Sequence, residues 1–218
     1  MKASHRTSKS SQSSQKYKIP HLKSLVLFIL LLALPQFLAP NSLAQTENLS
    51  FEQALTEASV IENMDSLTEL FNKLKEDSSI PFDYIEGGCY ARAEKMCLDL
   101  DIYHINSCKI FVEGDLKVAT KHGTAEWWFH VAPIVLLNEN GSHKPYVLDP
   151  SLFDRPVPVS EWISLQTDNM PARVKAIQVT KKFAFSPDKL NQKAKDYPLE
   201  DIKMMFLVFE VEKALLHH

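Results

Sequence analysis

The sequence is poor in glycine. Only 5 of its 218 residues are glycine, and it contains no glycine-rich phosphate loop and no dinucleotide-binding fingerprint. The 8 histidines and 3 cysteines lack the spacing typical of zinc ligands. We therefore expect neither a cofactor nor a metal ion. His104, His122 and His143 lie in expected loops, and His217–His218 is interpreted as a tail.

Acidic residues are absent from the first 44 positions, which contain six lysines and arginines. A basic start followed by an apolar run, here Leu25 to Leu34, is typical of a secretory signal peptide. Ser42-Leu43-Ala44 places small residues at the two positions that a signal peptidase reads. We therefore interpret residues 1–44 as a signal peptide cleaved before Gln45, and expect a secreted or periplasmic protein.

A membrane anchor is the alternative interpretation of this leader. The uncharged stretch from Ser24 to Ala39 has 16 residues and contains Pro35. A membrane-spanning helix needs ~20 apolar residues, so this stretch is short for an anchor. No cysteine precedes Cys89, which argues against a lipoprotein.

Basic residues are also scarce in the remainder of the chain. Residues 45–218 carry 18 lysines and arginines against 27 aspartates and glutamates, a net charge of −9. Nucleic-acid binding needs a basic surface, so this balance argues against a nucleic-acid partner. The 174 residues suit one domain with a substantial core, which we expect to be a monomer.

Two glycines, Gly87 and Gly88, precede Cys89 at the expected start of a helix. An apolar stripe of helical period follows, and the charged residues are expected to face elsewhere. The stripe consists of Ala93, Met96, Cys97 and Leu100, and the charged residues are Arg92, Glu94, Lys95 and Asp99. A thiolate in the first turn is stabilised by the helix dipole and the unpaired N–H groups. Cys89 is therefore a candidate nucleophile, the alternative being a buried, unreactive cysteine after a turn.

The segment before Cys89 has the pattern of amphipathic helices. Apolar residues recur at helical intervals over residues 49–77, and Ser66 with Glu69 fits the capping-box spacing. We interpret residues 45–80 as an N-terminal helical segment that packs on the domain, with a removable pro-segment as the alternative. Residues 81–218 then form the domain that carries Cys89.

A β-hairpin is expected around Asn140-Gly141, the strongest short hairpin signal. If the turn is centred there, paired residues have numbers that sum to 281. His130 and Asp149 then lie on one face as diagonal neighbours. A sum of 279 would make them direct partners, whereas a sum of 280 would place them on opposite faces.

Three cysteines are an odd number for an exported protein. One disulfide and one free thiol is the usual interpretation, and a bond between Cys97 and Cys108 would leave Cys89 free. Three free thiols are the alternative. Residues 108–112, rich in β-branched and aromatic side chains, are expected to form a strand.

The chain after Phe153 is less regular. Prolines punctuate residues 156–171, residues 174–185 alternate like a strand, and residues 186–188 open an expected short helix. The apolar run 204–211 favours an edge strand over a helix. The resulting fold class is α+β, with the Cys89 helix packed on an antiparallel sheet that bears His130 and Asp149.

Cysteine, histidine and aspartate in this order form an arrangement that activates a thiol. Three short motifs, Gly88–Ala93, His130–Ala132 and Asp149–Phe153, resemble the secreted bacterial protein-glutaminase family. These are protein-glutamine deamidases whose core resembles those of transglutaminases and papain-like enzymes. The resemblance extends from about Pro81 to Phe153. The chain departs from the family in its short segment before the core and in its divergent part after Phe153.

The resemblance implies that residues 81–218 are a catalytic domain acting on accessible glutamines of proteins or peptides. It implies Cys89 as nucleophile, His130 as general base and acid, and Asp149 as the acid that orients the imidazole. A cysteine peptidase or transglutaminase with the same triad, or a non-enzymatic exported binding module on this fold, is the alternative.

Other residues could complete such a site. The Cys89 backbone N–H is the expected oxyanion donor, and a hydroxyl of Thr120 or Thr124 could be the second. Trp127 and Trp128 could form the walls of the cleft, although alternation along a strand predicts that one of them packs inside. Trp162 is expected in the core.

Overall fold

The computed structural model describes residues 51–182, 184 and 199–216. The chain divides into two compact units, 1–43 and 44–218, and all described residues belong to the second unit. The elements in order are α1 (Phe51–Leu55), β1 (Val60–Ile61), α2 (Met64–Lys75), α3 (Cys89–Ile102), β2 (Cys108–Thr120), β3 (Gly123–Glu139), β4 (Ser142–Val147), β5 (Val157–Pro158), α4 (Val159–Thr167), the 3-10 turn η1 (Pro171–Arg173), β6 (Val174–Lys181) and α5 (Leu199–Leu216).

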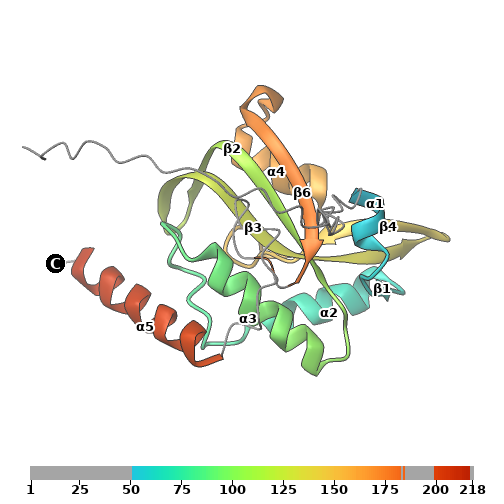
Figure 1. Ribbon diagram of the computed structural model, residues 1–218, viewed down its shortest axis with the longest axis horizontal. Helices are drawn as coiled ribbons and strands as arrows, with labels where there is room; N and C mark the ends of the chain where they lie inside the picture. Colours follow the sequence, from blue (N-terminus) through green and yellow to red (C-terminus); the bar gives the residue numbers. More distant parts are fainter. Residues whose placement is uncertain (1–50, 183, 185–198, 217–218) are drawn as a thin grey trace, which may run out of the picture. The chain divides into compact units, whose positions relative to one another are not determined.

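The strands of the described residues form one six-stranded sheet in the order β5-β4-β3-β2-β6 (Figure 1). These neighbours are antiparallel, and β1 adds to the sheet by pairing parallel with the far end of β3. Helices cover the sheet, so the α+β prediction is confirmed.

The β3–β4 hairpin has the expected register. Its pairs run from Glu139 with Ser142 to Ile134 with Val147, and every pair sums to 281. Asn140 and Gly141 both have positive φ, 55° and 85°, as a tight hairpin turn requires. The pairing of β4 with β3 ends at Ile134 and Val147. The residues of β3 that precede Ile134 therefore have an edge free for contact with helix α3.

Two hydrophobic clusters lie on the two faces of the sheet. Helices α2, α3 and α5 contribute to one cluster, and α1 and α4 to the other. Helix α4 was missed by the sequence analysis, which expected an irregular stretch there. Pro158 precedes its first residue as the N-cap, a place where a proline interrupts no helical hydrogen bond.

Helix α3 begins at Cys89, as expected, and its apolar stripe is buried. The prediction for the charged residues is wrong in part, because Arg92 and Glu94 are also buried. Glu94 forms an ion pair with the buried Lys109 of β2, and Lys109 also donates to the Ala184 carbonyl at 3.0 Å. The sheet therefore supplies partners that a helical pattern alone does not reveal.

The N-terminal segment contains two helices, as expected, with β1 between them. The predicted cap at Ser66 is wrong, since α2 begins earlier and Asn63 is its N-cap. The Asn63 side chain accepts a hydrogen bond from the Ser66 backbone N–H at 2.8 Å.

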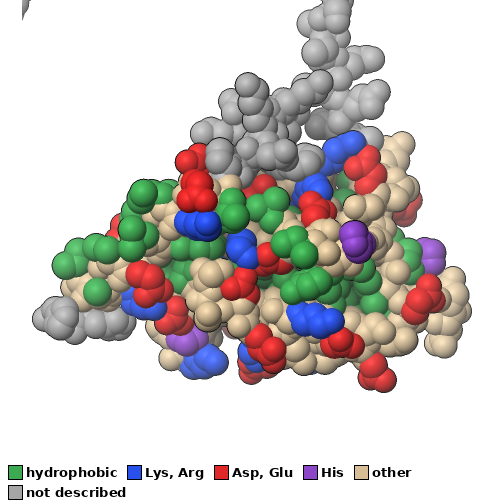
Figure 2. Space-filling model, turned by 90° about the horizontal axis from the view of Figure 1, so that it is seen from below, with side chains coloured by type: hydrophobic (Ala, Val, Ile, Leu, Met, Phe, Trp, Pro, Cys, Tyr) green, Lys and Arg blue, Asp and Glu red, His purple; other side chains and the backbone are tan. Residues whose placement is uncertain are grey.

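Residues 204–211 are helical, so the predicted edge strand is wrong. Ile202, Phe206 and Phe209 recur at helical spacing and are buried against the rest of the domain. Other apolar residues of α5 form an exposed stripe, visible as the green side chains at the left of Figure 2. This stripe consists of Met204, Leu207, Val208, Val211 and Leu215. Because apolar residues lie on two faces of α5, the sequence lacks the single apolar stripe of helical period from which a helix is predicted.

All three cysteines are free, so the expected bond between Cys97 and Cys108 is absent. The Cys108 thiol points to the face covered by α1, where it donates to the Ala54 carbonyl at 3.1 Å. The next residue, Lys109, points to the opposite face and pairs with α3, the helix that carries Cys97. Alternation along β2 therefore keeps the two thiols on opposite sides of the strand.

The predicted strand over residues 174–185 is confirmed as far as Lys181, where β6 ends. The expected helix at residues 186–188 lies outside the described residues, as does the leader. Among the described residues, no helix combines the length and apolar character needed to cross a membrane.

Candidate active site

Helix α3 presents Cys89 at its first position. Gly88 is the N-cap and has φ 72°, a left-handed conformation that glycine adopts at little cost. A side chain at Gly88 would also collide with the ring of Phe209, because an added Cβ would lie 2.3 Å from it. This glycine is thus required by the turn and by the packing of α5. Cys89 itself is 8% exposed.

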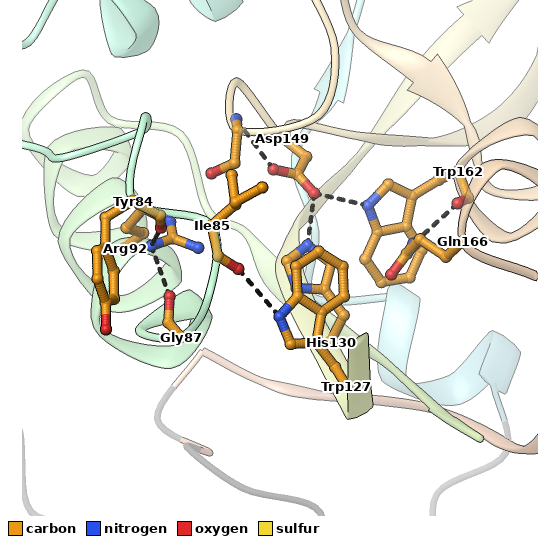
Figure 3. Close-up of polar contacts among 10 residues, drawn as sticks. Tyr84, Ile85, Gly87, Arg92, Trp127, His130, Asp149, Trp162 and Gln166 are labelled. Carbon is orange, nitrogen blue, oxygen red and sulfur yellow. Dashed lines mark hydrogen bonds and ion pairs between the residues drawn. The ribbon is translucent and has the colours of Figure 1, made fainter. Parts of the chain in front are cut away.

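His130 and Asp149 are brought together at the open edge of the hairpin (Figure 3). His130 Nε2 lies 2.8 Å from Asp149 Oδ2, and both side chains are buried. The other carboxylate oxygen, Oδ1, accepts from the Ser151 backbone N–H at 3.2 Å. The diagonal placement expected from the hairpin register is therefore what the structure contains.

Two tryptophans enclose the His130 ring. Trp127 stacks on it with a centroid distance of 4.7 Å and an angle of 12°, and Trp162 lies 5.5 Å away at 28°. Each indole N–H donates to a part of the site: Trp127 to the Ile85 carbonyl at 3.0 Å, and Trp162 to Asp149 Oδ2 at 2.8 Å. The ring is thereby held in one plane, and the sheet is linked to the loop that leads to Cys89 (Figure 3).

The Cys89 sulfur completes the cluster. His130 Nδ1, the ring nitrogen not used by Asp149, is buried and makes no hydrogen bond among the described residues. The Cys89 thiol lies close enough to the ring for the two groups to shift one another's pKa. The backbone N–H of Val131, on the strand edge that β4 leaves free, also lowers the pKa of the thiol.

Electrostatics favour a thiolate and an imidazolium in this cluster. Burial raises the pKa of Cys89, but His130, Arg92 and the Val131 N–H outweigh it and lower the pKa overall. Burial lowers the pKa of His130, yet the Asp149 carboxylate and Cys89 raise it to about 9. For Asp149, burial raises the pKa, and the interactions with His130 and Trp162 more than reverse that effect. A lowered thiol pKa beside a raised imidazole pKa favours the thiolate–imidazolium pair over the neutral pair.

The two candidate threonines lie at the β2–β3 turn. The Thr120 hydroxyl donates to the Gly123 carbonyl and accepts from the His122 N–H, so it serves the β2–β3 turn. Thr124 is six residues before His130 on the same strand, roughly 20 Å away at the rise of an extended chain. The second oxyanion donor therefore stays a prediction.

The other aromatic and histidine residues considered in the sequence differ in their exposure. Trp127 is half-buried beside His130, whereas Trp128 is 57% exposed, so one of the pair packs inside as alternation predicts. His104, His122 and His143 are exposed. In the part of the chain that the structure describes, no group of three potential ligand side chains could hold a metal ion.

A cavity of about 540 Å³ adjoins the loop that leads to Cys89. It is lined by residues 83–86 of that loop, by residues 121–124 of the β2–β3 turn and by Lys213 of α5. Asp83 and Lys213 form an ion pair across it at 2.9 Å. The cavity gives the site an open, polar neighbour on the side of α5.

Sequence reasoning missed two groups near the cluster. Arg92 was expected on an exposed face but is buried, and Trp162 was expected in the core but also bonds to Asp149. The spacing of Arg92 three residues after Cys89 places it one turn along the helix, a signal that could have identified it. No local signal connects Trp162 with Asp149, because helix α4 itself was not recognised.

Comparisons with known proteins agree with this geometry. A family model described as a glutaminase matches residues 67–166. The chain is similar to a crystal structure of protein-glutaminase, with 32% identity and a TM-score of 0.54 over 60% of this chain and 79% of the other. The NMR structure of protein-glutaminase from Chryseobacterium proteolyticum also has 32% identity, with a TM-score of 0.63 over 71% and 90%. A crystal structure of pro-protein-glutaminase has 32% identity and a TM-score of 0.61 over 71% and 59%. None of the curated proteins matches.

Proposed function

This chain belongs to the protein-glutaminase family, a family of enzymes, and on that premise we propose that it is a secreted protein-glutamine deamidase with Cys89, His130 and Asp149 as its catalytic triad. It hydrolyses glutamine side-chain amides of protein substrates to glutamate and ammonia. The observation that carries the proposal is the buried cluster in which the His130 ring lies between the Cys89 thiol and the Asp149 carboxylate.

The reaction begins with attack of the Cys89 thiolate on the carboxamide carbon of a glutamine side chain. The C–N bond then breaks, and the His130 imidazolium gives its proton to the departing ammonia. A thioester remains. Neutral His130 takes a proton from water, the hydroxide adds to the thioester carbonyl, and the C–S bond breaks to release glutamate and restore the thiolate and imidazolium.

Asp149 orients the ring throughout this cycle. Its bond to Nε2 at 2.8 Å leaves Nδ1 toward Cys89, the position needed for proton transfer. Trp162 shares the same carboxylate oxygen and thus limits its movement. A fixed acid keeps the imidazole in one tautomer and stabilises its charged form.

The first position of α3 supplies an oxyanion donor. The backbone N–H groups of a first helical turn have no carbonyl partner within the helix, and the dipole there favours negative charge. The Cys89 N–H is therefore the donor nearest to the carbonyl oxygen of a substrate attached to the sulfur.

The function is tested by incubating the purified protein with a glutamine-containing protein substrate. We expect ammonia release together with the mass shift of glutamine to glutamate in an intact chain. Chain cleavage without ammonia would identify a peptidase, and incorporation of an added amine would identify a transglutaminase. Neither product nor ammonia from any glutamine-rich protein would contradict the proposal.

Secretion through cleavage of residues 1–44 is part of the proposal and rests on the basic and apolar pattern of the leader. N-terminal sequencing of the exported protein should begin at Gln45. A chain that retains its leader in the membrane fraction would contradict cleavage.

We further propose that residues 45–80 stay with the enzyme. Within this segment Leu67, Phe71 and Leu74 of α2 belong to the main hydrophobic cluster, and β1 is a strand of the sheet. Removal of such a segment would expose the core, so the mature active protein should retain it, as mass spectrometry can establish.

A further inference from the structure

Arg92 is a buried cation beside the proposed nucleophile. It lies three residues after Cys89 on α3, one turn along the helix, and is 2% exposed. Its Nη1 donates to the Tyr84 carbonyl at 2.7 Å and to the Gly87 carbonyl at 2.8 Å (Figure 3). Both carbonyls belong to the turn that leads into Gly88 and Cys89. The guanidinium thus ties the start of the helix to the turn before it.

These two hydrogen bonds give the guanidinium N–H groups acceptors, but backbone carbonyls do not neutralise the positive charge of Arg92. Within the described part of the chain, no carboxylate lies within ion-pair distance of Arg92, in contrast to Lys109, which pairs with Glu94. A buried charge is unfavourable unless an opposite charge lies nearby. An arginine stays protonated inside a protein, so this charge is permanent.

The anionic groups that face Arg92 come from three elements. They are Cys89 on the same helix, Asp149 after β4 and Asp83 on the preceding loop, whereas the nearby Tyr84 has a pKa raised to about 12 and is neutral. Asp83 is exposed and already pairs with Lys213, and Asp149 already accepts from His130 and Trp162. Of these groups, the Cys89 sulfur is the one without a charged partner already described, so its ionisation is the one that Arg92 can favour.

We propose that Arg92 is a positioning residue that holds the turn before Cys89 and whose permanent charge stabilises the Cys89 thiolate. The inference rests on the proposed role of Cys89 and adds a second cation to its surroundings, next to His130. The lowered pKa of Cys89 has Arg92 among its causes, which agrees with the geometry. Arg92 thereby favours the reactive form of the sulfur before any substrate binds.

Two substitutions separate the charge of Arg92 from its hydrogen bonds. Arg92→Lys keeps the charge and loses the planar fork, whereas Arg92→Gln keeps an N–H donor and loses the charge. Arg155→Gln is the matched control, since Arg155 pairs with Glu161 on the exposed surface. Circular dichroism establishes that each variant folds.

The measurement is the rate of alkylation of Cys89 by iodoacetamide over a pH series in the full chain, with the modified site identified by mass spectrometry. Cys97 and Cys108 are buried thiols with pKa values raised to about 11, so they contribute little at neutral pH. We expect Arg92→Gln to raise the pH midpoint by about one unit, which makes alkylation about tenfold slower below the midpoint. Arg92→Lys and the control should alkylate like the wild type.

A folded Arg92→Gln protein with an unchanged midpoint would overturn the proposal. If that variant does not fold, Arg92→Met removes the charge in its place and should raise the midpoint by about one unit, whereas an unchanged midpoint in a folded Arg92→Met protein, or a midpoint raised by about one unit in Arg92→Lys, contradicts the role of the charge. Alkylation needs no substrate, so this result is independent of ammonia release. A protein that shows the Arg92 effect but deamidates nothing would refute the proposed function and leave this inference standing.

Discussion

Helix α3 carries two buried cysteines whose surroundings act in opposite directions. Cys89, at the first position, has a lowered pKa because His130, Arg92 and a backbone N–H outweigh its burial. Cys97, two turns further along, is almost fully buried, and burial raises its pKa to about 11. Burial alone therefore makes a thiol inert. A helix start and two cations lower the pKa of Cys89, as the proposed nucleophile requires.

The same contrast holds for the charged pairs around the two thiols. At the helix start, the buried His130 ring lies between the Cys89 thiol and the Asp149 carboxylate. Further along the helix, Glu94 and Lys109 form a buried ion pair, and Lys109 also donates a hydrogen bond to the Ala184 carbonyl. The first pair has a free ring nitrogen available for proton transfer, and the second pair is satisfied within the fold. We interpret the second pair as structural.

The largest effect is expected from replacing Cys89 and not Cys97 with alanine. Cys89→Ala should abolish ammonia release while the protein folds normally, because alanine fits a helix start and only the thiol is lost. Cys97→Ala is the matched control on the same helix and should retain activity near the wild-type value. Ammonia assays on both variants, with circular dichroism as a folding check, test this. Substantial activity of Cys89→Ala would refute the proposed nucleophile.

The next largest effects concern the histidine and its acid. His130→Ala should be about as inactive as Cys89→Ala, since one group performs both proton transfers. Asp149→Asn should lose ~10² to ~10⁴ in kcat, because the ring is held in the wrong tautomer. The combination of Cys89→Ala with Asp149→Asn should be no worse than Cys89→Ala alone, as expected for residues that act as a unit. Near-normal ammonia release by His130→Ala would show that another group is the base.

The buried pair Glu94 and Lys109 should affect stability and not chemistry. Glu94→Gln leaves a buried charge without its partner, which costs ~3–5 kcal/mol in the free energy of unfolding. Urea denaturation measures this loss, and the pH profile of Cys89 alkylation in the same variant should be unchanged. The control is Lys117→Met, which breaks an exposed pair with Glu126 and should cause no measurable loss. A shifted alkylation profile in Glu94→Gln would mean that the two charged regions are coupled.

The smallest effect concerns how the free energy of unfolding depends on pH. In the wild-type chain the contributions of His130 and Cys89 to this dependence oppose each other. The pKa of His130 rises from 6.5 to about 9 on folding, so its stabilisation is complete below pH 6.5 and is lost as the pH rises through about 9. The pKa of Cys89 is lowered from 9.0, so its stabilisation is present above pH 9 and is lost as the pH falls through the lowered value. The two contributions therefore change with pH in opposite directions, and the free energy of unfolding of the wild-type chain should depend less on pH than either contribution alone.

Cys89→Ala removes one of these opposing contributions. Its free energy of unfolding should fall with rising pH above about 6.5, by up to ~1.4 kcal/mol per pH unit. Urea denaturation over a pH series measures the slope, and the additional change His130→Ala should remove it. A flat profile in Cys89→Ala would show that His130 does not hold its proton in the folded state.

Much of the candidate site follows from local sequence patterns. The apolar period from Ala93 to Leu100 predicts the helix that begins at Cys89, and Asn140-Gly141 determines the hairpin register. Alternation along the two strands then places His130 and Asp149 on one face, and their contact at 2.8 Å confirms it. These predictions succeed because a helical stripe and a two-residue turn depend on neighbours within a few positions.

Predictions that needed distant contacts failed. The run 204–211 is helical because Ile202, Phe206 and Phe209 pack against the domain, although its β-branched and aromatic content favoured a strand. Likewise Cys97 and Cys108 have suitable spacing for a disulfide but lie on opposite sides of β2. Composition and loop length do not record which face of a strand another element covers.

The sequence by itself determined the α+β class, the helix start at Cys89, the hairpin register and the order of the three triad candidates. Only the tertiary structure decided that the Cys89 sulfur meets the His130 ring, that Arg92 is buried beside both, and that Trp162 shares the Asp149 carboxylate. The reason is physical. Periodicity and turn chemistry act over a few residues, whereas burial and the pKa of a thiol depend on charges brought together from α3, β3 and α4 by the packing of the whole domain.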